Sequence, residues 1–422
     1  MRAPDGGVVD EPHASSGSDT AHSPEGRSPE GGSPEGGPPE ERGLLHRRFH
    51  RRHLLIGAGA AVVLAGAGVG ISEWVSSPPA SSPDVDRFRS RPDLLPFETT
   101  LEVPADGVAP GYVFLTSGAG PGQRGPMIVD NEGRLVWFHR VLPAGHAATN
   151  LKVQQYRGRP VLTWWEGEIV IPQGYGKGEY VIADTSYREI TRVRGAHGLH
   201  GDLHELVLTS GGTALFTAYR TERADLRSIG GPRRGQLLDS LIQEVDVASG
   251  NLLFEWDPRD HVALAESYAS PSAIPANGGE YDFFHANSID VEPDGTLLVS
   301  ARHTWAVYKI DRKSGDIVWR LNGKRSDFDV AEDAQFQYQH DAIRAPDGSL
   351  TLFDDGSAPP DVAVRSRGLA LSVDEARRKV TLLEEYLPDP RTLTTSQGSV
   401  QTLSNGNRFV GWGSQPYASE YA

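Results

Sequence analysis

Cysteine is absent from this 422-residue chain. Its absence excludes disulfide bonds, thiolate metal sites and cysteine nucleophiles, but it does not identify a compartment, because many exported bacterial proteins also lack cysteine. Positive charge is scarce as well: 41 Lys and Arg residues stand against 56 Asp and Glu residues, for a net charge of −15. A nucleic-acid-binding protein is expected to present a basic face, so nucleic acid is not an expected partner.

The residues that are plentiful favour an all-β fold. The chain is 38% hydrophobic and contains 8 Trp, 13 Tyr and 13 Phe, which is enough for a large core. It also contains 48 Gly and 30 Pro. That composition suits many short strands joined by turns better than it suits long helices.

The N-terminal 95 residues differ from the rest of the chain. Residues 1–46 are rich in Pro, Gly and Glu, with the repeat "SPEGRSPEGGSPEGGPPEE" from Ser23 to Glu41, and we expect them to be disordered because they have little to bury. Residues 76–95, which include "SSPPASSPDVD", are expected to form a linker.

Residues 47–75 contain two arginine pairs, Arg47-Arg48 and Arg51-Arg52, followed by an apolar run from Leu54 to Ile71. This pattern is typical of a twin-arginine export signal. The alternative is a membrane anchor, because 18 apolar residues can just span a bilayer. Basic residues precede the run, so in either case we expect the rest of the chain to lie outside the cytoplasm, secreted or membrane-anchored.

Residues 96–422 predict a β-propeller, with six four-stranded blades as the best count. Short runs of β-branched and aromatic residues follow turns that end in glycine, and two kinds of hairpin alternate with self-similarity at roughly 50–80 residues. A pair of β-sandwiches is the alternative. The turn glycines are Gly133, Gly212, Gly250, Gly295, Gly315, Gly348 and Gly406.

Three polar residues share one position relative to these turns. His204, Asn287 and His340 each stand eight residues before a turn glycine. The innermost strands of a propeller line its central channel, so equivalent positions on them should converge near the axis.

Two further polar residues belong to the same predicted hairpin, "FFHANSIDVEPDGTLLVSAR". His285 precedes Asn287 by two residues, so strand alternation puts both on one face. In two of the three probable pairing registers Arg302 lies opposite His285 or Asn287. Other histidines share no such register and are expected to be structural or exposed, among them His46, His139, His146, His261 and His303.

Two kinds of chemistry could use this set. His197, His200 and His204 in "HGLHGDLHE" could bind zinc or copper, but their spacing fixes no ligand geometry and no carboxylate is clearly recruited. The other chemistry is transfer of an anionic group, in which Arg302 binds a tetrahedral oxyanion, Asn287 adds a neutral donor and a neutral imidazole attacks. The chain has no nucleotide-binding loop, so the expected donor is a simple ester.

Several segments resemble the arylsulfotransferase (arylsulfate sulfotransferase) family, in its actinobacterial-type branch. They are "FFHANSIDVEPDGTLLVSAR", "VYKIDRKSGDIVWRLNGKRSDF", "FQYQHDA" and "GWGSQP", and the similarity covers roughly residues 100–422. The resemblance implies a six-bladed propeller that moves a sulfuryl group from a phenolic sulfate ester to a phenolic acceptor. It also implies a sulfohistidine intermediate, no adenylylated donor (a PAPS-independent reaction) and no cofactor.

By motif, the resemblance makes His340 the nucleophile, while His204, His285, Asn287 and Arg302 bind sulfate and assist proton transfer. The sequence departs from the enterobacterial type because it has no cysteine for a disulfide and little room for a separate N-terminal β-domain. Its last segment, "GWGSQPYASEYA", stops where relatives usually continue, so we expect either a truncated chain or a last blade that closes differently, for example by borrowing the strand near Gly111–Gly118.

A non-catalytic propeller that binds a small anionic or aromatic ligand outside the cytoplasm is the competing hypothesis, because a propeller alone does not establish catalysis. A quinone-dependent dehydrogenase would need calcium-binding carboxylates and more blades. The acidic segment "DFDVAEDAQ", Asp327 to Gln335, is better explained as a solvated loop. Membrane contact is expected only through the N-terminal segment.

Overall fold

The computed structural model describes residues 51–56 and 90–422, except residues 119, 271–278 and 359–361. The chain divides into two compact units, Met1–Arg48 and Phe49–Ala422. The first unit lies outside the described residues, and so do the predicted disordered tail and most of the predicted signal or anchor segment.

The described residues form 26 strands and no α-helix, which confirms the all-β prediction. Among these residues no helix is both long and apolar enough to cross a membrane. The short 3₁₀ helices are η1 (Ala196–Gly198), η2 (Arg227–Ile229), η3 (Pro258–Asp260), η4 (Leu264–Glu266) and η6 (Glu332–Ala334).

The strands of the N-terminal half form two sheets. The first has three strands: β3 (Val113–Ser117), β4 (Gly125–Val129) and β5 (Leu135–Phe138). The second has nine strands and begins with β6 (Ala147–Tyr156), β7 (Arg159–Val170), β8 (Tyr175–Ala183) and β9 (Glu189–Val193). It continues with β10 (Gly201–Leu208), β11 (Thr213–Ala224), β12 (Gly235–Asp246), β13 (Leu252–Trp256) and β14 (Glu280–Asp282).

The remaining strands form three sheets. One contains β15 (Ala286–Val291), β16 (Leu297–Ala301), β17 (Ala306–Ile310) and β18 (Ile317–Leu321). The next contains β19 (Asp329–Val330), β20 (His340–Arg344), β21 (Leu350–Asp354), β22 (Arg367–Asp374) and β23 (Lys379–Tyr386). The last contains β1 (Arg51–Ile56), β2 (Thr99–Leu101), β24 (Ser399–Thr402), β25 (Arg408–Gly411) and β26 (Tyr417–Tyr421).

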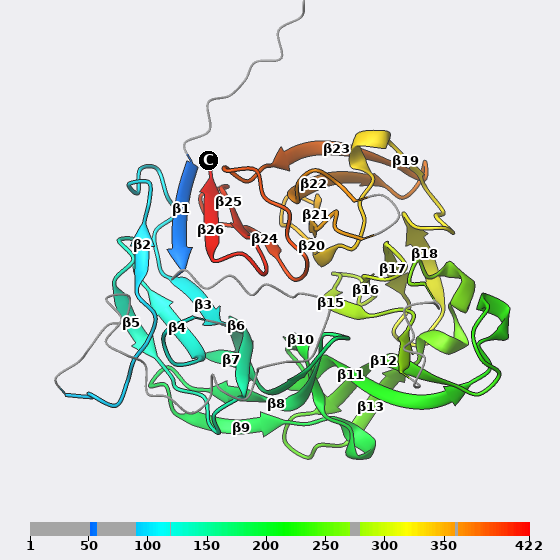
Figure 1. Ribbon diagram of the computed structural model, residues 1–422, viewed down its shortest axis with the longest axis horizontal. Helices are drawn as coiled ribbons and strands as arrows, with labels where there is room; N and C mark the ends of the chain where they lie inside the picture. The colour runs from blue at the N-terminus through cyan, green and yellow to red at the C-terminus, as the bar shows by residue number, and fades with distance from the viewer. Residues whose placement is uncertain (1–50, 57–89, 119, 271–278, 359–361) are drawn as a thin grey trace, which may run out of the picture. The chain divides into compact units, whose positions relative to one another are not determined.

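These sheets follow one another around a ring, which is the arrangement of a β-propeller (Figure 1). β6, β10, β15 and β20 lie toward the centre, and each contacts the next. The β-sandwich alternative is therefore wrong. The nine-stranded sheet joins a four-stranded group, β6–β9, to a five-stranded group, β10–β14, through a single pair, Gly178 and Gly201. The count of six blades stays a prediction.

One expectation was that the last sheet would borrow the strand near Gly111–Gly118, and the structure shows that it does not. β3 pairs with β4 instead, because a short connection makes that local hairpin the least costly loop to close. β26 pairs with β25 on one side and with β1 on the other. β1 lies in the segment predicted to be a signal or anchor.

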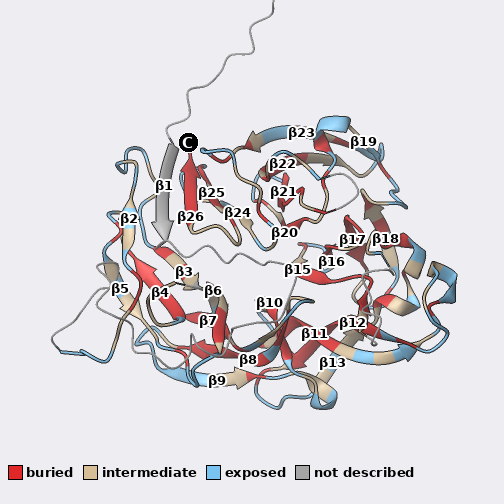
Figure 2. Cartoon of the chain, viewed as in Figure 1, coloured by how far each residue is buried: buried red, intermediate tan, exposed pale blue. Residues whose placement is uncertain are grey.

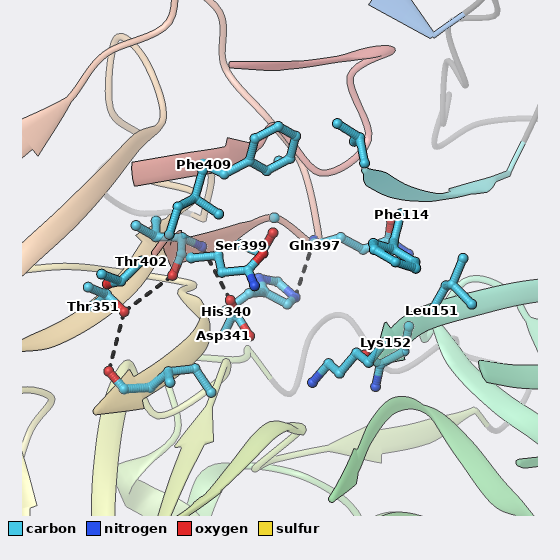
Figure 3. A pocket seen from close by; sticks show the side chains of 18 of the residues that line it. Phe114, Leu151, Lys152, His340, Asp341, Thr351, Gln397, Ser399, Thr402 and Phe409 are labelled. Carbon is cyan, nitrogen blue, oxygen red and sulfur yellow. Dashed lines mark hydrogen bonds between the residues drawn. The ribbon is translucent and has the colours of Figure 1, made fainter. Parts of the chain in front are cut away.

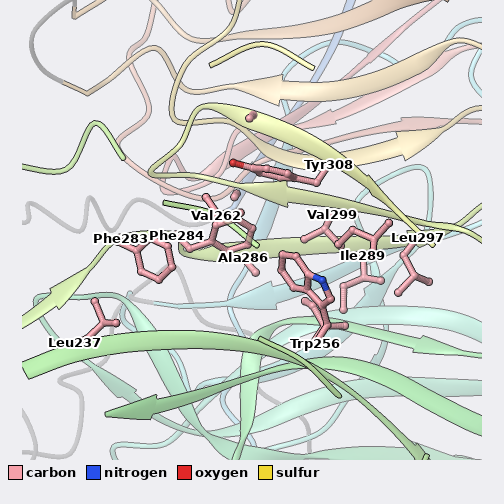
Figure 4. Packing of buried hydrophobic residues seen from close by; sticks show 14 of the residues in the cluster. Leu237, Trp256, Val262, Phe283, Phe284, Ala286, Ile289, Leu297, Val299 and Tyr308 are labelled. Atoms are coloured by element: carbon pink, nitrogen blue, oxygen red, sulfur yellow. The ribbon is translucent and has the colours of Figure 1, made fainter. Parts of the chain in front are cut away.

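Buried residues concentrate on the faces where neighbouring sheets meet (Figure 2). One such cluster joins the β12–β13 hairpin to β15–β17 (Figure 4). In it the ring of Phe284 lies 5.7 Å from that of Trp256 and 5.2 Å from that of Tyr308. Phe283 and Phe284 are fully buried, and this packing fixes the backbone immediately before His285.

The turn glycines that follow His204, Asn287 and His340 by eight residues have equivalent conformations in the structure. Gly212, Gly295 and Gly348 have φ values of 80°, 83° and 85°. Each donates its N–H to the carbonyl three residues earlier, at distances of 2.8 to 3.0 Å. Residues with side chains rarely adopt this conformation, which explains the glycine at the turn.

Candidate active site

The structure brings the three predicted histidines together. His204 lies on β10, His340 begins β20, and His285 directly precedes β15. The imidazole centroid of His204 is 5.0 Å from that of His285 and 6.3 Å from that of His340. The alignment on turn glycines therefore located residues that are distant in sequence and neighbours in space.

Arg302 lies opposite His285, in one of the two registers that we predicted would bring it to the site. The Arg302 N–H donates to the His285 carbonyl at 3.0 Å. The simple alternation between His285 and Asn287 is interrupted, however. His285 has a φ of 59°, and the register with β16 shifts between Ala286 and Ser288. This irregularity is a β-bulge, which changes the direction of side chains.

The neighbouring inner strands carry register shifts at the same level. The shifts lie between Thr149 and Lys152 on β6 and between His340 and Ile343 on β20. Asn150 and Asp341, within these intervals, have φ values of 57° and 56°. Asn150 also stands eight residues before the turn glycine Gly158, so the spacing rule could have identified it.

His340 is held through both ring nitrogens. Its Nδ1 lies 2.6 Å from Oδ2 of Asp355, which is fully buried, and its Nε2 accepts the Gln397 backbone N–H at 3.3 Å (Figure 3). Because Nε2 accepts, the ring proton is on Nδ1. Burial, together with the charge of Arg302 and the neighbouring imidazoles, keeps the pKa of His340 well below its ordinary value. His340 is therefore neutral and carries a lone pair on Nε2.

The other two histidines also pair with buried carboxylates. Nδ1 of His204 lies 2.6 Å from Oδ2 of Asp202, and Nδ1 of His285 contacts Oδ2 of Asp282. Burial and the charge of Arg302 hold the pKa of His285 well below its ordinary value. Our reading of the sequence missed these aspartates, although "DLH" and "DFFH" place each one shortly before its histidine.

Arg302 lies behind His285. Its Nη2 is 3.2 Å from Nδ1 of His285 and 3.2 Å from Nε2 of His303, and it donates to the Gln173 carbonyl at 3.3 Å. Its Nε is buried without a hydrogen-bond partner among the described residues. The imidazole centroid of His303, a residue we expected to be structural or exposed, lies only 5.0 Å from that of His285. It was missed because it lies at a hairpin end rather than on an innermost strand.

A cavity of about 690 Å³ reaches the histidines along the inner strands. His204, Asn287 and His340 line it, whereas His285 and Arg302 do not. Asn287 Nδ2 donates to the Gln339 carbonyl at 2.7 Å, and Asn287 Oδ1 is buried with no partner in the described part of the chain. The site therefore offers two imidazoles and an amide oxygen to a bound molecule.

Residues 152–422, more than half of the chain, match the arylsulfotransferase (ASST) family. The chain belongs to that family. The matched range contains all five predicted site residues, so the arylsulfotransferase region and the histidine cluster coincide. No curated protein matches the chain.

Solved structures similar to this arylsulfotransferase family member show low identity. A protein of unknown function from Bacteroides caccae has a TM-score of 0.42 and 12% identity, covering 71% of this chain and 82% of that chain. The Dos1 propeller has a TM-score of 0.37 and 10% identity, covering 71% and 62%. Virginiamycin B lyase from Staphylococcus aureus has a TM-score of 0.37 and 10% identity, covering 74% and 95%.

A metal ion fits this site poorly. His197 and His200 are exposed, and they do not join His204 in any ligand group among the described residues. The group that does assemble there consists of Asp282, His285 and His303, whose ligand atoms lie within 4.8 Å of one another. The Arg302 guanidinium contacts both of its imidazoles, and its positive charge opposes a cation at that position.

Proposed function

We propose that this chain transfers a sulfuryl group from a phenolic sulfate ester to a phenol through a sulfohistidine at His340. The observation that carries the proposal is the neutral imidazole of His340 on the cavity wall, with its Nδ1 bound to buried Asp355. Membership of the arylsulfotransferase family supports aryl sulfotransferase activity in general.

In the first half-reaction Nε2 of His340 exchanges its contact with Gln397 for the sulfur of the donor. The N–S bond forms while the ester O–S bond breaks, and the electron pair of that bond leaves on the phenolate oxygen. His204 lines the same cavity, so it is the histidine placed to protonate the departing oxygen. Nδ1 of His204 contacts Oδ2 of the buried Asp202, which orients the ring for this proton transfer.

In the second half-reaction the acceptor phenol occupies the position of the departed phenol. Its proton passes to His204, the new O–S bond forms, the N–S bond breaks and the electron pair returns to Nε2 of His340. Protons and electrons balance over the cycle without a cofactor. The two half-reactions together require that His204 first give up a proton and then regain it.

Asn287 and Arg302 would stabilise the sulfuryl oxygens in different ways. Asn287 lines the cavity and can present its second Nδ2 hydrogen. Arg302 does not line the cavity, so its contribution would be the positive potential that it adds behind His285, unless the donor draws it forward. The same potential helps to keep the imidazoles of His285 and His340 neutral.

Replacement of the proposed nucleophile tests the mechanism directly. His340→Ala should abolish transfer, and rapid neutral quenching of the wild type with donor alone should reveal one added sulfuryl group on the peptide containing His340. His200→Ala, at an exposed histidine, is the matched control and should retain full activity. A label on another peptide, or turnover by His340→Ala, would remove the mechanism.

The substrate class is tested with 4-nitrophenyl sulfate. Release of nitrophenolate that depends on added phenol indicates a transferase, and release without phenol indicates a sulfatase. Binding without release indicates the non-catalytic ligand-binding propeller. We further propose that the reaction takes place outside the cytoplasm, a proposal supported by the arginine pairs ahead of the apolar run.

A further inference from the structure

The cavity wall contains charged groups that the transfer reaction does not use. Lys152 on β6, Glu205 on β10 and Asp341 on β20 all line it. Lys152 Nζ lies 2.6 Å from Oε1 of Glu205, so these two side chains neutralise each other. Asp341 accepts the Val400 backbone N–H at 3.2 Å and forms no ion pair within the described part of the chain.

The carboxylates that surround Lys152, two of them on the cavity wall, outnumber the cations that they face. Asp290 on β15 adds a third carboxylate beside Glu205 and Asp341, and Lys152 is the cation that interacts with all three. Arg344 also lines the cavity, but its Nε donates to Glu292 at 2.8 Å. Burial and the neighbouring carboxylates raise the pKa of Asp341 to about 6, although Lys152 opposes that shift. The negative charge at Asp341 is thus incompletely compensated.

A second feature of the cavity points independently to a ligand with hydrogen-bond donors. Asn287 is 5% exposed and lines the cavity, and its Oδ1 has no partner among the described residues. Leaving a buried acceptor unpaired is unfavourable, so a donor on a bound molecule would relieve this cost. Oxygen acceptors from three inner strands therefore line one cavity.

The same cavity has an apolar part. Phe114 on β3, Leu151 on β6 and Phe409 on β25 line it, and their side chains lie around the space beside His340 and Asp341 (Figure 3). Aromatic and aliphatic side chains of this kind bind the faces of an aryl ring.

We propose that this cavity is the acceptor subsite and that it selects phenols carrying an ammonium group, with the aryl ring against Phe114, Leu151 and Phe409 and the ammonium group bound by Asp341, Glu205 and Asn287. An ammonium group supplies three donors and a positive charge, which match these oxygen acceptors. The role of this cavity as an acceptor subsite rests on the proposed sulfuryl transfer. The binding preference itself does not require catalysis.

Equilibrium binding to the full-length protein tests the preference. Three phenols of similar size differ in charge: tyramine is cationic, 4-ethylphenol is neutral and 3-(4-hydroxyphenyl)propionate is anionic. By isothermal titration at pH 7.5 we expect tyramine to bind roughly tenfold more tightly than 4-ethylphenol, and the propionate to bind most weakly. Equal affinities, or tighter binding of the anion, would overturn the proposal.

Asp341→Asn isolates the carboxylate, because an amide oxygen can still accept the Val400 N–H. It should reduce the advantage of tyramine over 4-ethylphenol to within about twofold. Asp316→Asn, at an exposed turn position between β17 and β18, makes the same charge change and should leave the advantage intact. Retention of the full advantage in Asp341→Asn would contradict the assignment.

The pH dependence of wild-type binding gives a second measurement that needs no variant. Asp341 faces Lys152, Glu205 and Asp290, and its carboxylate gains a proton as the pH falls through about 6. The ratio of tyramine affinity to 4-ethylphenol affinity should therefore decrease from pH 7.5 to pH 5, and a constant ratio would count against Asp341.

Labelling of His340 with donor alone reports separately on the proposed function. A labelled protein that lacks the binding preference would contradict only the acceptor subsite. A protein that shows the preference but acquires no label would contradict only the transferase mechanism.

Discussion

Each site histidine is oriented by a buried aspartate. Asp202, Asp282 and Asp355 contact Nδ1 of His204, His285 and His340. A hydrogen bond at Nδ1 fixes the tautomer and leaves Nε2 as the reacting atom. Asp355 matters most at the proposed nucleophile, because His340 can attack only if the lone pair is on Nε2.

Asp355→Asn should therefore slow formation of the sulfohistidine by roughly 100-fold or more. The asparagine amide can donate to Nδ1, which would favour the tautomer with the proton on Nε2 and block attack. Single-turnover release of nitrophenolate measures this step. Asp355→Glu should recover part of the rate, whereas an unchanged rate in Asp355→Asn would show that Asp355 is only structural.

The buried histidines also predict how stability depends on pH. The folded protein holds the pKa of His340 well below its ordinary value near 6.5, so below that pH the unfolded chain binds a proton that the folded protein does not. The free energy of unfolding should then decrease as the pH falls from 6.5 to 5.5, by up to about 1 kcal/mol for this histidine, because half of the unfolded molecules already carry the proton at pH 6.5.

Urea denaturation of the wild type and of His340→Gln at pH 6.5 and 5.5 isolates this contribution. Ionisable groups that lie far from His340 titrate alike in both proteins and cancel in the comparison. The wild type should lose more stability than the variant. An equal loss in the two proteins would mean that His340 is not held neutral.

At the scale of elements, one hairpin design positions several site residues. A glycine turn closes one end of β10–β11, β15–β16 and β20–β21, and a register shift interrupts the pairing near the other end. The distance between turn and site residue is the same in each hairpin, because strands rise by a nearly constant amount per residue. The bulge then turns the side chain of the site residue away from the face that regular strand alternation would give it.

Gly348→Ala tests the contribution of the turn. A Cβ at this position would meet no atom within 4 Å, so its cost is conformational: φ is 85°. We expect the free energy of unfolding to fall by about 1 kcal/mol, and by less in Gly348→Asn because asparagine adopts this region more readily. Urea denaturation measures both. An alanine variant as stable as the wild type would contradict the conformational argument.

At the scale of the whole molecule, the ring brings residues from separate sheets to one cavity. β3, β6, β10, β15, β20, β24 and β25 all contribute to its wall. No single hairpin contains a complete site, so the arrangement depends on every sheet packing against the next. Buried clusters between the sheets, such as that around Trp256 and Phe284, provide this packing.

Export of the chain is a prediction from the sequence alone. If the arginine pairs form a twin-arginine signal, Arg51→Lys with Arg52→Lys should retain the protein in the cytoplasm, because that pathway reads the arginine pair rather than its charge. Cell fractionation followed by immunoblotting measures the distribution. Undiminished export of the double variant would favour the membrane-anchor hypothesis.

The sequence by itself determined the repeating features of this protein. Glycine turns and short apolar runs depend on local chemistry, so they predicted the all-β propeller and the shared position of His204, Asn287 and His340. The same local argument left two registers that bring Arg302 to the site, and the structure adopts the one that places Arg302 opposite His285. These features could be predicted because turn conformation and strand period are properties of a few consecutive residues.

Only the tertiary structure decided which atoms meet. Asp355 reaches His340 across a hairpin, His303 joins Arg302 and His285 from a hairpin end, and Asp341 enters the cavity because a bulge redirects the chain. His340 lines the cavity and Arg302 does not, although the sequence had grouped them at one surface. Such contacts depend on bulges and on the packing of one sheet against another, and these follow from the energy of the whole fold rather than from any local pattern.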